Sequence, residues 1–272
     1  IKISCVNINS IRAHFQDVEA ELSDCSTHIL ALTETWLTPN VDSSCIAIPN
    51  YNFVQNDREI LADSQLRFLQ GGGVACYLHK SLCYTILECS NNTNINSPEY
   101  LFVSIKSSTQ NLLLIIVYRQ PHGLLFSEFL NKLNLYVSTY SNIVITGDLN
   151  CDLLTDNFES KYLSDFLNDY SFFSVPYGPT HYSTHSHSQL DVVIVDSSDK
   201  IHNFSKSSVP FAAGHCLVTV YYQFSNLNKI PHNITYRNFV NCNHTSLAND
   251  LSSLLSVKLS KPPLATIIHR SQ

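Results

Sequence analysis

Hydrophobic and polar positions follow two different periods along the first 225 residues. In three stretches the apolar residues recur at steps of three and four, which predicts amphipathic helices over 11–22, 126–140 and 158–170. Short apolar runs of strand length lie around them, at 1–8, 28–32, 74–78, 101–105, 112–118, 143–145, 192–195 and 217–222. Hairpins mixed with helical connections predict a layered fold of the α/β (α+β) class, in which helices cover sheets.

Polar side chains stand where several of these apolar runs begin or end. They are Asn7, Asn9, Glu34, Tyr118, Arg119, Asp148, Asn150, Asp191 and His215. Strand ends in layered folds gather at one rim, where side chains converge on a ligand. Each residue also has an ordinary structural interpretation, such as Asp148 as a turn residue or His215 as one of twelve histidines. As a set they supply oxygen ligands for Mg²⁺, a base for water and donors for phosphate, which indicates metal-assisted phosphoester hydrolysis.

Short motifs around these residues carry a resemblance to a known family. In chain order they are Asn7-Ile8-Asn9, Thr33-Glu34-Thr35-Trp36-Leu37, Gly72-Gly73-Val74-Ala75, Val117-Tyr118-Arg119-Gln120-Pro121, Gly147-Asp148-Leu149-Asn150, Leu190-Asp191 and Gly214-His215. Together, over about residues 1–224, they resemble the endonuclease/exonuclease/phosphatase superfamily, which includes apurinic/apyrimidinic endonucleases, DNase I and inositol polyphosphate phosphatases. The resemblance implies a DNase I-like fold, a four-layered sandwich of two mixed β-sheets flanked by helices.

Two stretches look like the endonuclease domains of jockey-type non-LTR retrotransposons. They are Gly147-Asp148-Leu149-Asn150-Cys151-Asp152 and Pro179-Thr180-His181, with Asp191 eleven residues beyond Thr180. This likeness implies an endonuclease that nicks DNA, and the 3′-hydroxyl at the nick would prime reverse transcription. It also implies a reverse transcriptase domain of the same polyprotein as a partner.

The resemblance implies a metal site and a proton-transfer site. Glu34 would be the principal ligand of Mg²⁺, with Mn²⁺ as an alternative, and Asn7 would assist it. Asp148 would position or deprotonate the attacking water. Asp191 would orient His215, which would stabilise the phosphate or transfer a proton.

It also implies residues that hold the phosphate and the DNA backbone. Asn150 and Tyr118 would hold the scissile phosphate. Arg119, Thr180 and Asn9 would contact phosphate or DNA. Thr184 is an alternative to Thr180 for this role, because the stretch 179–188 has little apolar periodicity and its register is hard to assign.

The last motif departs from the family pattern. The family commonly has Ser-Asp-His where this chain has Ala213-Gly214-His215, and Asn9 stands where some apurinic endonucleases have an acid. Fewer anionic ligands should weaken Mg²⁺ binding. A catalytically decayed copy that only binds DNA is therefore an alternative, and it predicts that Gly214→Asp restores nicking to an inert parent.

The charge distribution keeps a third function open. The net charge is −6, of which residues 1–225 carry −10 and residues 226–272 carry +4. An acidic domain does not attract a duplex by bulk electrostatics, so a phosphatase of the same superfamily is also an alternative. A dense cluster of Lys and Arg for a polyphosphate is not visible in the sequence.

The charge change near residue 225 also indicates a domain boundary. We expect an endonuclease/exonuclease/phosphatase domain over 1–225 and a linker toward a reverse transcriptase over 226–272, with one weak helix at 247–259. The chain has no methionine, so we expect a piece of a longer product. No apolar run has the length of a membrane span, and we expect a monomer without a membrane partner.

The cysteine pattern concerns the cellular compartment. Nine cysteines without a Cys-x-x-Cys pair favour buried, reduced thiols in a nuclear or cytoplasmic protein, with the nucleus as the site of action. The histidines His181, His185 and His187 offer a weaker alternative, a zinc cluster.

Overall fold

The computed structural model describes residues 1–59, 71–91, 96–107, 110–123 and 126–224, together with residues 245, 246, 248, 249 and 252. The contacts within the chain divide it into two units, Ile1–Lys229 and Ile230–Gln272. In the second unit the described positions are helical, and most of the helix predicted over 247–259 lies outside the described residues. The linker role of this segment stays a prediction.

The first unit contains two six-stranded sheets, each with both parallel and antiparallel neighbours. The first sheet has the order β13-β14-β1-β2-β4-β3. Its strands are β1 (Lys2–Asn7), β2 (Ile29–Thr33), β3 (Tyr51–Asn56), β4 (Val74–His79), β13 (Ile201–Ser208) and β14 (Cys216–Tyr222). β1 and β2 are parallel, whereas the other neighbours are antiparallel.

The second sheet has the order β5-β6-β7-β8-β12-β9. Its strands are β5 (Cys83–Cys89), β6 (Glu99–Lys106), β7 (Leu112–Tyr118), β8 (Ile143–Asp148), β9 (Phe173–Ser174) and β12 (Asp191–Val195). β7 and β8 are its parallel pair. A separate hairpin pairs β10 (His181–Tyr182) with β11 (His187–Ser188), and two 3₁₀ turns span Ser43–Ile46 and Ser198–Lys200.

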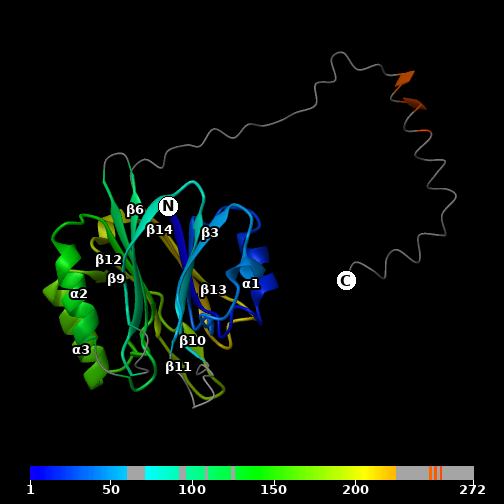
Figure 1. Ribbon diagram of the computed structural model, residues 1–272. Helices are drawn as coiled ribbons and strands as arrows, with labels where there is room; N and C mark the ends of the chain where they lie inside the picture. The colour runs from blue at the N-terminus through cyan, green and yellow to red at the C-terminus, as the bar shows by residue number, and fades with distance from the viewer. Residues whose placement is uncertain are drawn as a thin grey trace. The chain divides into compact units, whose positions relative to one another are not determined.

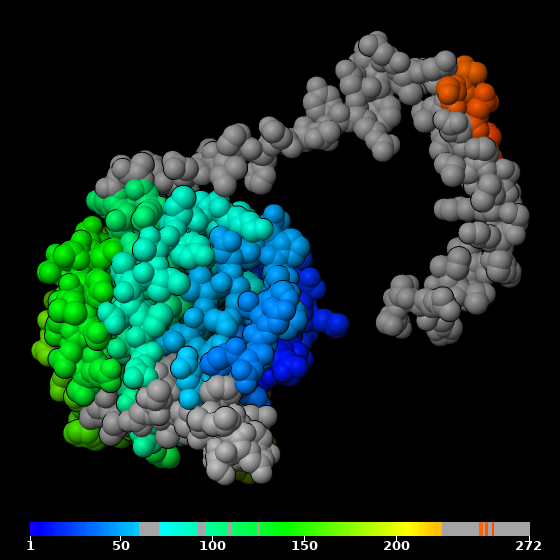
Figure 2. Space-filling view, in the orientation of Figure 1, coloured from blue at the N-terminus to red at the C-terminus, as the bar shows by residue number. Residues whose placement is uncertain are grey.

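Helices cover the outer faces of the two sheets. α1 (Phe15–Leu22) lies on the first sheet, and α2 (Ser127–Val137) and α3 (Phe158–Asp169) lie on the second (Figure 1). The same flanks are visible as the blue and green surfaces of this unit in Figure 2. The predicted four-layered sandwich of the DNase I type is therefore confirmed.

Strand β7 shows how the sequence produces these layers. Its seven residues are all buried, because alternate side chains point to opposite faces of the sheet. Leu112, Leu114 and Ile116 join the core between the two sheets. Leu113 and Ile115 join the core under α2 and α3. A strand buried on both faces has a continuous apolar run rather than an alternating one.

The sequence prediction missed the edges of the sheets. β3, β5 and β13 have few large apolar residues in alternation, and most side chains of β5 and β13 are partly or fully exposed. Edge strands are often short or polar, which keeps them from pairing with other chains. The predicted helix over 11–22 begins only at Phe15, because Ile11 lies in the preceding turn and still packs into the core.

The cysteines agree only in part with the expectation. The eight described cysteines form no disulfide, but Cys45, Cys83 and Cys89 are exposed rather than buried. Their strands and turns lie at the surface, so burial was the wrong inference for these three. No helix among the described residues is long and apolar enough to cross a membrane.

Candidate active site

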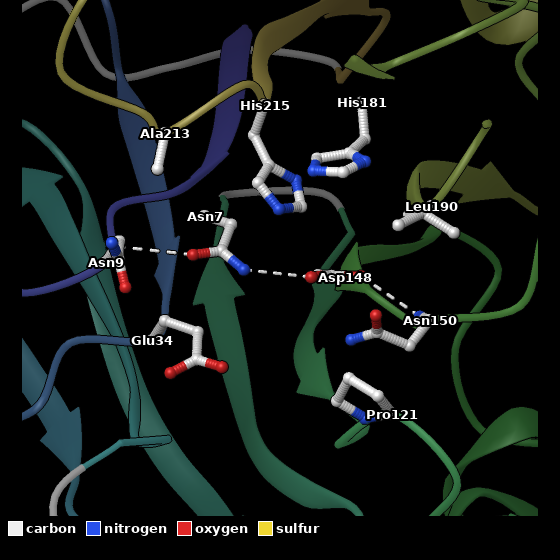
Figure 3. A pocket seen from close by; sticks show the side chains of 10 residues that line it. All are labelled: Asn7, Asn9, Glu34, Pro121, Asp148, Asn150, His181, Leu190, Ala213 and His215. Carbon is white, nitrogen blue, oxygen red and sulfur yellow. Dashed lines mark hydrogen bonds between the residues drawn. The ribbon is translucent and has the colours of Figure 1, made fainter. Parts of the chain in front are cut away.

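One pocket brings together most of the predicted site residues. It has a volume of about 340 Å³ and is lined by Asn7, Asn9, Glu34, Pro121, Asp148, Asn150, His181, Leu190, Ala213 and His215 (Figure 3). Six of these ten were predicted from the sequence. The predicted roles remain predictions, but the structure places these six side chains around a common space.

Strand register explains why distant segments converge here. In the first sheet Asn7 pairs with Thr33, so β1 and β2 end at the same rim. In the second sheet Asp148 is the partner of Tyr118 on one side and of Asp191 on the other. The ends of β1, β2, β7 and β8 and the start of β12 therefore meet, as expected for ligand sites at strand ends.

Asp148 is a buried carboxylate with two hydrogen-bond donors. Its Oδ2 accepts from Asn7 Nδ2 at 2.9 Å, and its Oδ1 accepts from the Asn150 backbone N–H at 3.0 Å. Burial, together with the charge of Asp191, raises the pKa of Asp148 to about 7, although His215 acts in the opposite direction. A carboxylate with this pKa can accept a proton near neutral pH.

Asp191 and His215 form a hydrogen-bonded pair behind Asp148. The two carboxylate oxygens of Asp191 lie 2.9 and 3.2 Å from His215 Nδ1. Burial alone would lower the pKa of His215, but the hydrogen bond and charge of Asp191 outweigh burial and raise it. Because Asp191 engages Nδ1, Nε2 is the ring nitrogen left for a ligand.

Glu34 occupies the opposite side of the pocket on an irregular backbone. Its φ is +57°, a left-handed conformation that non-glycine residues seldom adopt. Glu34 Oε2 accepts from Trp36 Nε1 at 2.7 Å and from the Gly72 N–H at 2.9 Å. The Tyr118 hydroxyl donates to Glu34 Oε1. Three donors thus fix the orientation of one carboxylate.

Tyr118 helps to orient the Glu34 carboxylate, to which its hydroxyl donates a hydrogen bond. Its side chain is buried, and burial together with the charge of Glu34 raises the pKa of its hydroxyl. The hydroxyl therefore stays protonated and serves as a neutral donor. The structure shows this hydrogen bond to Glu34, whereas the predicted contact of Tyr118 with phosphate stays a prediction.

Arg119 has a different environment from the one predicted. Its side chain is 1% exposed and pairs with Glu159 of α3. Its guanidinium also donates to the carbonyl oxygens of Leu149, Asn150 and Gly123, at 3.3, 3.2 and 3.0 Å. A phosphate contact is wrong for this geometry, because the cation is enclosed under the loop that follows β8. Arg119 instead supports that loop.

The burial of Thr180 contradicts the phosphate contact predicted for it. The residue is 0% exposed, and its Oγ1 accepts from the backbone N–H groups of Leu190 and Asp191 at 3.1 and 2.9 Å. This hydroxyl fixes the start of β12 rather than contacting phosphate. Thr184, the alternative, is exposed between β10 and β11 and does not line the pocket.

Sequence reasoning missed a buried ion pair behind Glu34. Arg58 Nε lies 2.5 Å from Glu99 Oε1, and Glu99 Oε2 accepts from the Gly73 N–H at 2.5 Å. A Cβ on Gly72 would lie 2.2 Å from the Arg58 guanidinium, so the loop approaches this pair as only glycine can. The available signal was Glu99, an acid that comes two residues before the apolar run at 101–105.

The donors around the pocket suit a hard divalent cation. Ligand atoms of Asp148, Asp191 and His215 lie within 4.8 Å of one another. The carboxylate of Glu34 and the amide of Asn7 line the same pocket. Mg²⁺ and Mn²⁺ prefer such oxygen donors, so the residues present fit the predicted cofactor. Of the three histidines considered for zinc, only His181 lines the pocket, and they form no metal-binding group within the described ranges.

Comparisons with known proteins concern the family of this chain and its fold. A family model described as endonuclease-reverse transcriptase matches residues 112–219, which include Asp148, Asp191 and His215. The match covers 108 of the 272 residues, from the start of β7 into β14. No curated protein matches the chain significantly.

Several solved structures share the fold of this chain at low sequence identity. The endonuclease domain of TRAS1, a telomere-specific non-LTR retrotransposon, has a TM-score of 0.61 at 14% identity, over 82% of this chain and 97% of that one. An AP endonuclease from Archaeoglobus fulgidus has a TM-score of 0.56 at 15% identity, over 82% and 100%. AP endonuclease LMAP from Leishmania major has a TM-score of 0.60 at 12% identity, over 82% and 87%.

Proposed function

We propose that this chain is a divalent-metal-dependent endonuclease that nicks DNA and leaves a 3′-hydroxyl. In a retrotransposon polyprotein that hydroxyl would prime a reverse transcriptase domain, and the family model that matches residues 112–219 supports this context. The observation that carries the proposal is the buried Asp148 carboxylate, with Asn7 on one side and the Asp191–His215 pair on the other.

Glu34 and Asn7 are the residues that would hold the cation. When bound, a divalent cation offsets phosphate charge and lowers the pKa of bound water. Asn7 turns its amide nitrogen to Asp148, so its Oδ1 is available as a ligand apart from a 3.2 Å contact from the Asn9 N–H. Tyr118 and Gly72 keep the Glu34 carboxylate oriented by their hydrogen bonds.

The remaining residues perform the displacement at phosphorus. Asp148 accepts a proton from the attacking water as the new P–O bond forms, and the P–O3′ bond breaks. The 3′ oxygen takes a proton from solvent water and leaves as the hydroxyl, while the other product carries a 5′-phosphate. His215, oriented by Asp191, stabilises the charge on the non-bridging oxygens. Asn150 lines the same space for the phosphate.

The alternatives predict different chemistry for the same pocket. An inositol polyphosphate needs several cations, and no Lys or Arg occurs among the pocket's described lining residues. The alternative of a catalytically decayed copy rests on Gly214, which stands where the family commonly has an aspartate. However, its φ is +94°, and a Cβ there would lie 2.4 Å from the Tyr182 carbonyl oxygen. We therefore expect Gly214→Asp to strain this backbone and displace the hairpin rather than restore nicking.

A plasmid-nicking assay tests the proposal. Supercoiled plasmid should be converted to the open circular form by the wild-type protein with Mg²⁺ or Mn²⁺, and remain supercoiled in EDTA. Asp148→Ala and His215→Ala should each remove this activity. A wild-type protein that leaves the plasmid supercoiled across titrations of both metals would contradict the proposed function.

A further inference from the structure

The small β10–β11 hairpin brings a second imidazole into the pocket. His181 lines the pocket, and its ring centroid lies 4.5 Å from that of His215, with the planes inclined at 49°. Figure 3 shows the two rings side by side. Among the described residues, no side chain or backbone group makes a hydrogen bond with the His181 ring. Its nitrogens are therefore available to a ligand in the pocket.

Backbone pairing fixes His181 beside His215. The two residues face each other in an antiparallel bridge, so their side chains lie on the same face. The Cys216 N–H donates to the Thr180 carbonyl at 2.7 Å, and the Tyr182 N–H donates to the Gly214 carbonyl at 2.9 Å. His181 is thus held by hydrogen bonds on both sides of the bridge rather than by a flexible loop.

Gly214 makes this pairing possible. A Cβ at that position would lie 2.4 Å from the Tyr182 carbonyl oxygen, which would push the hairpin away. The same Cβ would lie 3.5 Å from His181 Nε2. The space that a side chain at position 214 would enter is therefore bordered by the His181 ring.

The charge of the pocket determines how the His181 ring could interact with an anionic ligand. Glu34 and Asp148 are the acidic groups among the described lining residues, and they would repel a phosphodiester in the absence of a cation. Burial, with the charge of the neighbouring His215, lowers the pKa of His181. An imidazole presents an N–H donor to an anionic oxygen in either of its charge states.

We propose that His181 is a further substrate-contacting residue, which donates a hydrogen bond to a non-bridging oxygen of the phosphodiester beside His215. This inference rests on the proposed endonuclease function and extends it to a residue of the hairpin. His181 would complement the transition state, where the charge on these oxygens grows, as preorganised donors do in other hydrolases.

The chain provides matched controls for a kinetic test. His185 and His187 belong to the same hairpin but are exposed and do not line the pocket. His181→Ala should lower kcat by about 100-fold with little change in KM, at the lower end of the range for loss of one such donor. His181→Asn, which retains an N–H donor, should recover part of kcat. His185→Ala and His187→Ala should match the wild type in kcat and melting temperature.

A binding measurement separates this inference from the function on which it rests. The probe is a short nicked duplex with a 3′-hydroxyl and a 5′-phosphate, titrated into protein with ¹³C-labelled histidine in the presence of Ca²⁺, a hard cation that takes the same oxygen ligands. The His181 Cε1–H resonance should shift with the duplex, and His181→Ala should weaken binding by about 3–10-fold. An unmoved His181 resonance, with wild-type affinity and kcat in His181→Ala, would overturn the inference alone. A wild-type protein that neither nicks nor binds DNA would overturn the proposed function and this inference with it.

Discussion

The two acidic sides of the pocket are built in different ways. Asp148 and Asp191 are strand residues, and the register of β8 with β12 sets them opposite each other. Glu34 stands on a backbone with φ of +57°, and its carboxylate is fixed by Tyr118, Trp36 and Gly72. One side is positioned by the sheet itself, whereas the other depends on Trp36 of its own loop and on Gly72 and Tyr118 from two other segments.

This difference has a consequence for mutation. Changes at Asp148 should remove chemistry without disturbing the sheet, because backbone pairing holds the position. Changes around Glu34 should alter the orientation of its carboxylate and the metal affinity together, because two of its three donors come from other segments. Strain and buried charge at functional sites are commonly offset by the rest of the fold.

Asp148→Asn should have the largest effect on activity. Loss of the proton acceptor should lower the nicking rate by about 10³-fold, within the usual range for general-base removal. The rate of plasmid nicking at saturating Mg²⁺ measures this loss. A rate within threefold of the wild type would refute the role of Asp148.

The same variant should be more stable than the wild type at high pH. The folded-state pKa of Asp148 is raised to about 7, above the unfolded value of about 3.9. The folded protein therefore binds the proton more tightly, and stability is lost as pH rises from about 4 to 7. Asparagine carries no such charge, so we expect a gain of about 1–2 kcal/mol at pH 8 in EDTA. Thermal unfolding at pH 5 and pH 8 tests this, and an equal gain at both values would contradict it.

Glu34→Gln should have the next largest effect and a different signature. It keeps an oxygen acceptor but loses the charge, so nicking should fall by about 10²-fold and recover in part at high metal concentration. Asp148→Asn should not recover in the same titration. Identical metal dependence of the two variants would remove the distinction between the two sides of the pocket.

Gly72→Ala should disturb both the fold and the site. The φ of Gly72 is +67°, and the new methyl group would lie 2.2 Å from the Arg58 guanidinium. We expect a loss of about 2–3 kcal/mol in unfolding free energy and a roughly 10-fold lower nicking rate. Gly178→Ala is the matched control, because its φ is +66° but only Lys206 Nζ lies near, at 3.9 Å. Equal losses in both variants would show that the Arg58 contact contributes nothing.

Tyr118→Phe should have the smallest effect. It removes one of the three donors to Glu34 and leaves the ring packed in the core. We expect a 3–10-fold lower kcat and a change in stability near 1 kcal/mol, the usual contribution of one hydrogen bond. Steady-state kinetics and denaturant unfolding measure these two quantities. A 10³-fold loss would instead indicate direct contact of Tyr118 with the reacting phosphate.

The sequence predicted the strand-built side of the pocket well. The apolar runs before Asp148 and after Asp191 indicated strands, and strand ends gather at one rim. The core strands and the three helices were predictable for the same reason, because their periodicity is strong. Edge strands such as β13 were not, since their side chains are largely exposed and carry no apolar pattern.

The loop-built features depend on contacts that periodicity does not encode. Arg119 was expected at phosphate, but it lies under the β8 loop because Glu159 of α3 reaches it there. His181 gave no local sign of entering the pocket, because its place depends on the bridge to His215. Such placements follow from tertiary pairing between segments far apart in the chain.

The most direct test of the account is whether the protein makes an extendable nick in DNA. A polymerase with labelled nucleotides should extend the product of wild-type protein and Mg²⁺ without phosphatase treatment, because the nick carries a 3′-hydroxyl. Product made with Asp148→Asn, or in EDTA, should give no extension. Nicks that require removal of a 3′-phosphate before extension, or equal extension after treatment with Asp148→Asn, would contradict it.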